Sequence, residues 1–187
     1  MKNQFDSLIK KAMRIAILLF VIRCFISVDE ISHDISAYTI LGYAGEAIGV
    51  AALIMIIYEK WLWIVDPFVK IPYIAGDYKG IIKSGHDEKI RSASLAIKQS
   101  LLSVEVEMKT CESTSRSVTG GIEDVLNRPE LIYSYLNEPN ADVRDRSAIH
   151  YGTATFLLDK KGLLKGRYYT DRNTTGDMEF NKVKKYG

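Results

Sequence analysis

The sequence has few of the residues from which disulfide frameworks and metal centres are built. It contains two cysteines and three histidines in 187 residues. Cys24 lies in a long apolar run and Cys111 near the end of a predicted strand, so they form no disulfide framework. We expect unpaired thiols in a reducing compartment. No histidines and cysteines share the short spacings of a zinc site, so we expect no metal centre.

Motifs of catalysis and of nucleic-acid binding are also missing. The sequence has no nucleophile elbow and no phosphate-binding loop, and Gly120-Gly121 is typical of a turn or bulge. The formal net charge is +2, which does not provide the strongly basic field used by DNA-binding and RNA-binding proteins. We therefore predict a protein that is not an enzyme, needs no cofactor and binds neither DNA nor RNA.

Long apolar runs are present, and both lie in the first third of the chain. Residues 12–28 carry two charges, Arg14 and Arg23, and residues 37–58 carry one, Glu46. As helices these runs would be about 26 and 33 Å long, compared with a bilayer core of about 30 Å. The pattern predicts two transmembrane helices joined as a hairpin.

The first run does not have the features of a cleaved signal peptide. Arg23 interrupts its apolar stretch, and no site of two small residues follows it. We therefore predict an uncleaved hairpin over residues 1–66, with helices at about 12–28 and 37–62, followed by a linker at 67–73.

The charges that flank the two runs predict the topology of the hairpin. The basic residues near the outer ends of the runs are Lys10, Lys11, Arg14, Lys60 and Lys70. The connecting segment, residues 29–36, is acidic and has no lysine or arginine. By the positive-inside rule, we expect both chain ends and the domain that follows to lie in the cytoplasm, with the acidic segment on the other side of the membrane. Trp61 and Trp63 lie where an interfacial aromatic belt is expected.

Arg23 and Glu46 are opposite charges at matched depth in the two predicted helices. At the rise of a helix they lie about 18 and 19.5 Å from the membrane-flanking ends of their runs. Because a lone charge in hydrocarbon is costly, we expect a partner for each. They could pair within one hairpin or between two protomers. Gly45 and Gly49 form a small-xxx-small pattern that favours helix association.

From residue 74 the pattern changes to short alternating strands separated by glycine, asparagine and aspartate. The predicted strands are 74–83, 94–99, 103–110, 115–122, 130–136, 150–158, 163–170 and 176–183. Most connections are short, as in hairpins. Residues 74–187 therefore predict an all-β domain, an eight-stranded up-and-down (lipocalin-like) β-barrel, with a small sandwich as the alternative.

The faces of these strands that point inward carry many polar groups. We identify a candidate ligand set from them: Tyr78, Gln99, Tyr133, Tyr135, His150, Tyr168, Thr170 and Arg172. An eight-stranded barrel can fill its interior or hold one small ligand. Aromatic rings with hydroxyls and an arginine favour a pocket that stacks and hydrogen-bonds a ligand. The alternative is that the tyrosines are core residues and Arg172 is solvated.

Short segments in this order resemble a known family. They are residues 76–80, 131–135, 137–139, 150–153 and 166–169, followed by Arg172 and Gly176. Together with the helical hairpin, they make the chain similar to the two-transmembrane, β-strand-rich effectors of bacterial cyclic-oligonucleotide anti-phage signalling systems (CBASS). The resemblance implies that the barrel binds a cyclic dinucleotide made by a cognate nucleotidyltransferase. The protein would then form a homo-oligomer and disrupt the lipid bilayer of the inner membrane.

The chemistry of a cyclic dinucleotide agrees with the candidate residues. Its two bases could stack on the tyrosines, and a phosphate could take the forked guanidinium of Arg172. Gln99, His150 and Thr170 could read base edges. Two other functions stay open: a membrane-anchored lipocalin-like binder of a lipid or apolar metabolite, and a membrane adaptor that presents the polar segment 137–149 to another protein.

Overall fold

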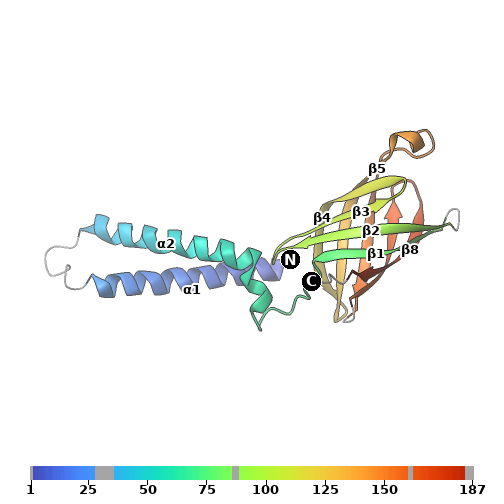
Figure 1. Cartoon of the computed structure of the whole chain (residues 1–187). Coiled ribbons are helices and arrows are strands. Elements are labelled where there is room, and N and C mark those ends of the chain that lie inside the picture. The colour runs from blue at the N-terminus through green and yellow to red at the C-terminus, as the bar shows by residue number, and fades with distance from the viewer. Residues whose placement is uncertain (1, 28–35, 86–88, 160–161, 184–187) are drawn as a thin grey trace. The chain divides into compact units, whose positions relative to one another are not determined.

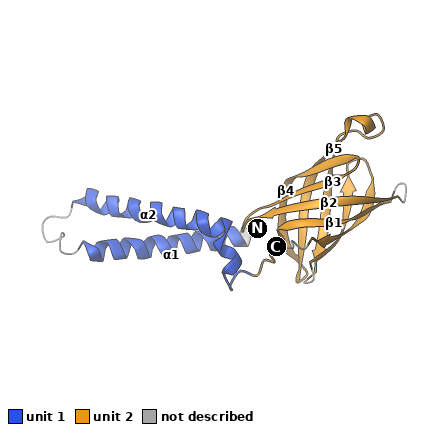
Figure 2. Ribbon diagram, viewed as in Figure 1, with its two compact units in different colours: residues 1–69 blue, residues 70–187 orange. Residues whose placement is uncertain are grey.

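The computed structural model describes residues 2–27, 36–85, 89–159 and 162–183, which form two compact units (Figures 1 and 2). Unit 1 is Met1–Val69 and contains both α-helices, whereas unit 2 is Lys70–Gly187 and contains all the described strands. The acidic connection predicted at 29–36 lies outside the described residues, except for Ser36.

Unit 1 consists of two long helices and a short third one. α1 spans Lys2–Ile26, α2 spans Ala37–Lys60, and the 3-10 helix η1 spans Leu62–Val65. α1 begins well before the predicted start at residue 12, because the polar residues that precede the apolar run also favour a helix. Of the described helices, α2 is the one long and apolar enough to cross a membrane. Membrane crossing by α1 stays a prediction.

Small residues on α2 mark its packing face. Ala47, Ala51 and Met55 follow one another at intervals of four residues and are buried, as expected for one stripe of a helix packed on its neighbour. A Cβ added at Gly45 or Gly49 would meet nothing within 4 Å. The two helices of the hairpin therefore contact each other without using the glycine face.

A polar cluster ties the two helices together near the end of unit 1. The ammonium group of Lys11 on α1 donates hydrogen bonds to the Tyr58 hydroxyl on α2 and to Asp66, which follows η1. The Tyr58 hydroxyl also donates to Asp66, and the Phe68 backbone N–H donates to the same carboxylate at 2.9 Å. Lys11, then Tyr58 and Phe68, lower the pKa of Asp66 to about 2.

Unit 2 is a closed antiparallel barrel in which each strand pairs with the next and β8 pairs with β1. The strands are β1 Gly76–Ser84, β2 Ile90–Gln99, β3 Val104–Thr110, β4 Ser113–Val125, β5 Arg128–Pro139, β6 His150–Leu158, β7 Leu163–Thr170 and β8 Thr175–Lys182. The predicted eight-stranded up-and-down barrel is confirmed, and the sandwich alternative is wrong. Closure leaves no free sheet edge.

β4 and β5 are longer than the sequence predicted. They continue to a two-residue turn, Leu126-Asn127, whose residues have φ angles of 52° and 62°. Two successive positive φ angles are typical of the type I′ turn, which matches the twist of a hairpin. The prediction ended the strands early because Asp124 and Asn127 have low β-propensity. A bulge between Ser117 and Thr119 bends β4 within this hairpin.

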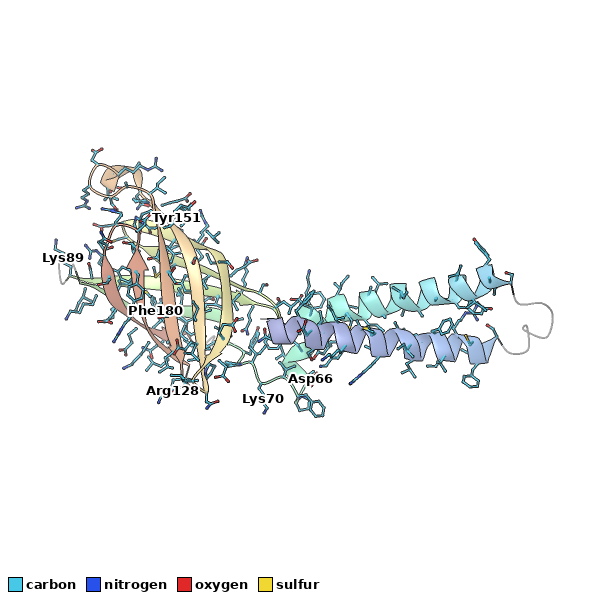
Figure 3. All side chains as sticks on the ribbon, turned by 180° about the vertical axis from the view of Figure 1, so that it is seen from behind. Asp66, Lys70, Lys89, Arg128, Tyr151 and Phe180 are labelled. Atoms are coloured by element: carbon cyan, nitrogen blue, oxygen red, sulfur yellow. The ribbon has the colours of Figure 1, made fainter. Side chains whose placement is uncertain are left out.

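Five aromatic rings in the barrel interior each lie directly opposite a glycine on a neighbouring strand. The pairs are Gly80–Phe180, Gly120–Tyr133, Gly152–Tyr135, Gly166–Phe156 and Gly176–Tyr168. A Cβ at these glycines would lie only 2.4–2.8 Å from a side-chain atom of the paired ring. The rings therefore use the space that a side chain would occupy. Phe180 lies inside the barrel (Figure 3). Its ring meets that of Phe156 edge to face, with ring centroids 5.9 Å apart.

The end of the barrel where the chain enters is closed by the linker. Gln99 accepts a hydrogen bond from the Ile74 N–H at 2.7 Å and donates one to the Pro72 carbonyl at 3.0 Å. The Tyr78 hydroxyl donates to the Ile74 carbonyl at 2.6 Å. Ile74 is buried with the barrel core. Both polar side chains therefore hold the linker across this end, which we call the closed end.

The Asp66 cluster predicts a pH-dependent contribution to stability. Because its folded-state pKa is depressed, Asp66 contributes stability fully above its unfolded pKa of about 3.9, and this is lost as pH falls towards 2. In thermal melts of the full-length chain in detergent, wild type should therefore have a higher melting temperature than Asp66→Asn at pH 7. This difference in melting temperature should shrink between pH 4 and 2. Asp77→Asn, an exposed carboxylate on β1, is the control. A pH-independent difference would contradict the prediction.

Candidate ligand-binding site

The end of the barrel opposite the closed end is hollowed into a cavity of about 790 Å³. The β1–β2, β3–β4 and β7–β8 turns and the β5–β6 connection meet there. We call it the open end. Its volume lies within the range of small-molecule sites, about 300–1,000 Å³.

The inward residues of each strand change in character from the open end towards the middle of the barrel. On β5 the inward series runs from Asn137 through Tyr135 and Tyr133 to Leu131. Neighbouring strands follow the same order, so polar side chains form a rim, tyrosines and aliphatic residues form a floor, and apolar side chains fill the core. The rim includes Ser84, Thr110, Ser115, Asn137, His150, Thr170 and Thr174, and the floor includes Ile82, Met108, Tyr135 and Tyr168.

Tyr135 and Tyr168 form the aromatic part of the floor. They lie over Gly152 and Gly176, which lets each ring lie against the barrel wall. Burial raises the pKa of Tyr135, and the neighbouring Tyr168 and Asp171 add to the shift. The Tyr135 hydroxyl therefore stays protonated at neutral pH and can donate a hydrogen bond. The floor therefore combines the half-buried ring of Tyr168 with the neutral hydroxyl of the nearly buried Tyr135.

The rim carries a concentration of positive charge. Its four basic side chains are those of Lys89, Arg91, Arg146 and Arg172, whereas Glu112 is the one carboxylate among the described lining residues. Arginine presents a planar fork of donors that matches carboxylate and phosphate oxygens. The open end is therefore suited to an anionic ligand with flat, stackable groups.

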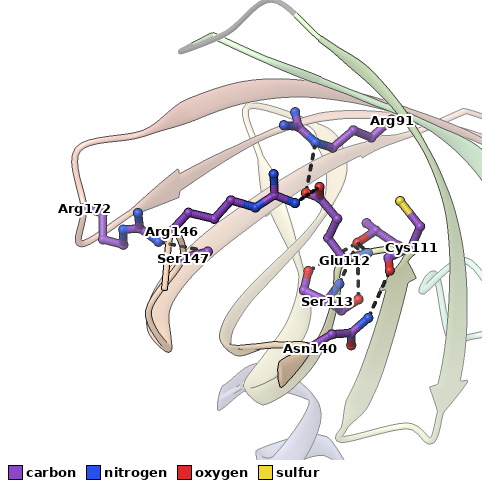
Figure 4. A network of polar contacts seen from close by, with 9 residues as sticks. Arg91, Cys111, Glu112, Ser113, Asn140, Arg146, Ser147 and Arg172 are labelled. Carbon is purple, nitrogen blue, oxygen red and sulfur yellow. Dashed lines mark hydrogen bonds and ion pairs between the residues drawn. The ribbon is translucent and has the colours of Figure 1, made fainter. Parts of the chain in front are cut away.

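The β5–β6 connection is held across the rim at several points (Figure 4). The Asn140 backbone N–H and side chain donate to the carbonyls of Glu112 and Cys111 at 2.8 and 3.0 Å. Arg146 donates to the Glu112 carboxylate at 2.7 Å, and Arg172 donates to the Ser147 hydroxyl at 3.1 Å. The connection, which contains the 3-10 helix η2 (Ala141–Val143), thus joins the turns on either side of it.

Comparison with known proteins identifies the barrel. Residues 69–182 match the family described as Cap15, cyclic dinucleotide receptor domain. The chain belongs to the Cap15 family. A curated relative, CD-NTase-associated protein 15 of Staphylococcus schleiferi, is 32% identical over 173 residues, which cover 90% of this chain and 89% of the relative. The family match covers all eight strands, and the likeness to the relative extends into the helical unit because it covers nearly the whole chain.

The Cap15-family barrel brings together five of the eight candidate ligand residues. Tyr135, His150, Tyr168, Thr170 and Arg172 line the open-end cavity. Tyr133 lies beneath the floor, fully buried, and its hydroxyl has no hydrogen-bond partner among the described residues. Tyr78 and Gln99 lie at the closed end, where they hold the linker.

Lys89, Arg91 and Arg146 line the Cap15-family cavity but were not among the sequence candidates. The signal for Arg91 was its alternation with Ala93 and Leu95, which places it on the inward face. The predicted strand began at residue 94 and so stopped short of it. Arg146 had no such signal, because its position depends on how the β5–β6 connection folds back over the rim.

Arg23 and Glu46 are in contact within one hairpin. The Arg23 Nε atom lies 3.2 Å from a Glu46 carboxylate oxygen. Arg23 also donates to the Ser27 hydroxyl at 2.7 Å and lies over the Tyr43 ring, 4.5 Å from its centroid. The intra-hairpin pairing considered from the sequence is thus present within one chain, and pairing between protomers stays a prediction.

The floor geometry predicts that Gly152 and Tyr135 are coupled. Gly152→Ala would place a Cβ 2.4 Å from the Tyr135 ring, and overpacking of this kind costs about 1–3 kcal/mol. Tyr135→Leu removes the ring atoms of this clash, whereas the Tyr169 carbonyl oxygen, 2.7 Å from the same Cβ, remains, so we expect a partial rescue. In thermal unfolding of the full-length chain, the double variant should lose less stability than the sum of the losses of the two single variants. Additive effects would mean that the ring does not lie against Gly152.

Proposed function

We propose that the chain is a membrane effector of CBASS whose barrel binds a cyclic dinucleotide in the open-end cavity. The observation that carries this proposal is the combination of an aromatic floor with a basic rim at one end of a Cap15-family barrel. A nucleotidyltransferase activated by phage infection would supply the ligand. Binding would drive assembly of the helical units and disruption of the inner membrane, and the infected cell would die.

The cavity and the ligand are complementary in charge and shape. A cyclic dinucleotide carries two bases and two singly charged phosphates on a compact ring. The ring of Tyr168, which is half-buried, would stack on a base, and such stacking contributes about 1–3 kcal/mol per base in single-strand binders. Tyr135 is only 3% exposed and would contribute its edge or hydroxyl. Arg172, His150 and Thr170 line the cavity, which supports a role for Arg172 in forking onto a phosphate and for His150 and Thr170 in contacting polar edges of the bases. The proposed site leaves out Tyr78 and Gln99, which are engaged at the closed end.

The filled interior of the barrel disfavours a function in binding long apolar chains. Below the floor, Phe156, Phe180 and Leu131 are completely buried and pack together. A fatty acyl chain needs a deep apolar tunnel, whereas this cavity ends on tyrosines and has a basic rim. The segment that could serve an adaptor is tied to the rim through Asn140 and Arg146. These observations favour a receptor for a compact anion.

Loss of an arginine at the rim should weaken ligand binding, whereas loss of an arginine at the other end of the barrel should not. Arg172→Ala removes a charged hydrogen bond to phosphate and should cost about 1.5–3 kcal/mol of binding free energy. The measurement is titration calorimetry of the full-length chain in detergent with cyclic di-AMP, cyclic di-GMP and cyclic GMP–AMP. Arg128→Ala, at the opposite end of the barrel (Figure 3), is the matched control and should bind as wild type does. Absence of binding to every cyclic dinucleotide would contradict the proposed function.

The proposed membrane topology places both helices across the bilayer. α2 has the length and composition for a span, and α1 would cross with its basic residues reaching the interface. Lys60 and Lys70 would hold the barrel on the cytoplasmic side, together with both chain ends. The glycine face of α2, with Gly45 and Gly49, is open in the single hairpin and would serve contacts between protomers.

The Arg23–Glu46 pair predicts a test of the membrane unit. Removal of either partner leaves a charge unpaired in hydrocarbon, so Arg23→Ala or Glu46→Ala should reduce membrane insertion or ligand-triggered leakage. The exchange Arg23→Glu with Glu46→Arg should recover part of the loss. The readouts are dye release from proteoliposomes and membrane fractionation, with Lys98→Ala, an exposed lysine on the outer face of β2, as control. Single variants that insert and leak like wild type would show that the pair has no role in either process.

A further inference from the structure

Glu112 places a carboxylate in the middle of the basic rim, between two arginines (Figure 4). One oxygen accepts a hydrogen bond from Arg146 Nη2 at 2.7 Å, and the other lies 3.6 Å from Arg91 Nε. The three side chains come from the β3–β4 turn, the β5–β6 connection and β2, respectively. A phosphodiester likewise has one negative charge and two free oxygens that accept from arginine.

We propose that Glu112 occupies the phosphate subsite of the open-end cavity, and that a ligand phosphate displaces it to reach Arg91 and Arg146. This inference rests on the proposed function, because it assigns the anion subsite of that cavity and its regulation. The carboxylate and a phosphate repel each other and need the same donors, so they do not share the site. Glu112 therefore lowers the apparent affinity and sets the ligand concentration at which the receptor fills.

The contacts around Glu112 make such an exchange feasible. The side chains of Arg146 and Glu112 are 67% and 38% exposed, so water screens their attraction and a ligand with two phosphates can compete. The Asn140 hydrogen bonds to the backbone of Cys111 and Glu112 do not involve the carboxylate. The turn and the β5–β6 connection can therefore stay joined while the Glu112 side chain leaves.

Glu112→Gln tests the exchange, because the amide keeps the shape but loses the charge that competes. Titration calorimetry of the full-length chain with cyclic di-AMP, cyclic di-GMP and cyclic GMP–AMP should show binding about tenfold tighter than wild type, as expected for loss of two partly exposed ion pairs. Glu107→Gln is the matched control. Glu107 also lies between two cations, Lys109 and Arg116, but on the outer surface of β3, so its variant should bind as wild type does.

A double variant tests whether the tighter ligand binding of Glu112→Gln depends on the arginines. In Glu112→Gln with Arg146→Ala, most of the tightening should disappear, because one of the donors released by the first change is gone. Unchanged or weaker binding by Glu112→Gln alone would overturn the inference; weaker binding would mean that Glu112 positions the arginines for the ligand.

Inorganic pyrophosphate separates this inference from the proposed ligand. If no cyclic dinucleotide binds wild type or Glu112→Gln, the proposed function fails. Titration with pyrophosphate then tests by itself whether Arg91 and Arg146 form an anion subsite. Tighter pyrophosphate binding by Glu112→Gln than by wild type and Glu107→Gln would support the assignment of Arg91 and Arg146 as an anion subsite masked by Glu112. Equal or absent binding by all three proteins would overturn it.

Discussion

Five of the large rings in the barrel interior lie directly opposite a glycine; Tyr78, which lies opposite Leu95 and Lys182, is the exception among the described core rings. An eight-stranded barrel has room for side chains from all its strands only if bulky residues are matched with small ones. Here the match is made across strands, because each of the five rings lies where the Cβ of its partner would be. Phe156 and Phe180 fill the middle, whereas Tyr135 and Tyr168 end the packing. The pairing of rings with glycines therefore fills the core and also determines where the cavity ends.

The two ends of the barrel use polar side chains for different purposes. At the closed end, Gln99 and Tyr78 form hydrogen bonds to the linker backbone and have their polar groups satisfied there. At the open end, arginines outnumber the one described carboxylate, Glu112, and surround a cavity. Excess charge of one sign around a cavity favours an ion of the opposite sign, so the charge of the open end is the physical basis for proposing it as the receptor end.

The helical unit is held by polar contacts at two levels. Lys11, Tyr58 and Asp66 join the helices near one end, and Arg23 pairs with Glu46 farther along. Both contacts set the register of α1 against α2, because each requires particular residues to meet. The face with Gly45 and Gly49 takes no part in this packing and is left open. A hairpin built in this way could associate through one face without losing its internal contacts.

The strand pattern, the inward faces and the pairing of Arg23 with Glu46 followed from the sequence, because alternation and helical rise are local and repeat along the chain. Of the candidate ligand residues, Tyr135 and Tyr168 lie in the cavity and Tyr78 and Gln99 do not, although all four point inward. Alternation gives the face of a residue but not its height in the barrel. Closure and strand register decided which inward residues share an end, and the fold of the β5–β6 connection brought Arg146 to Glu112 and Arg91.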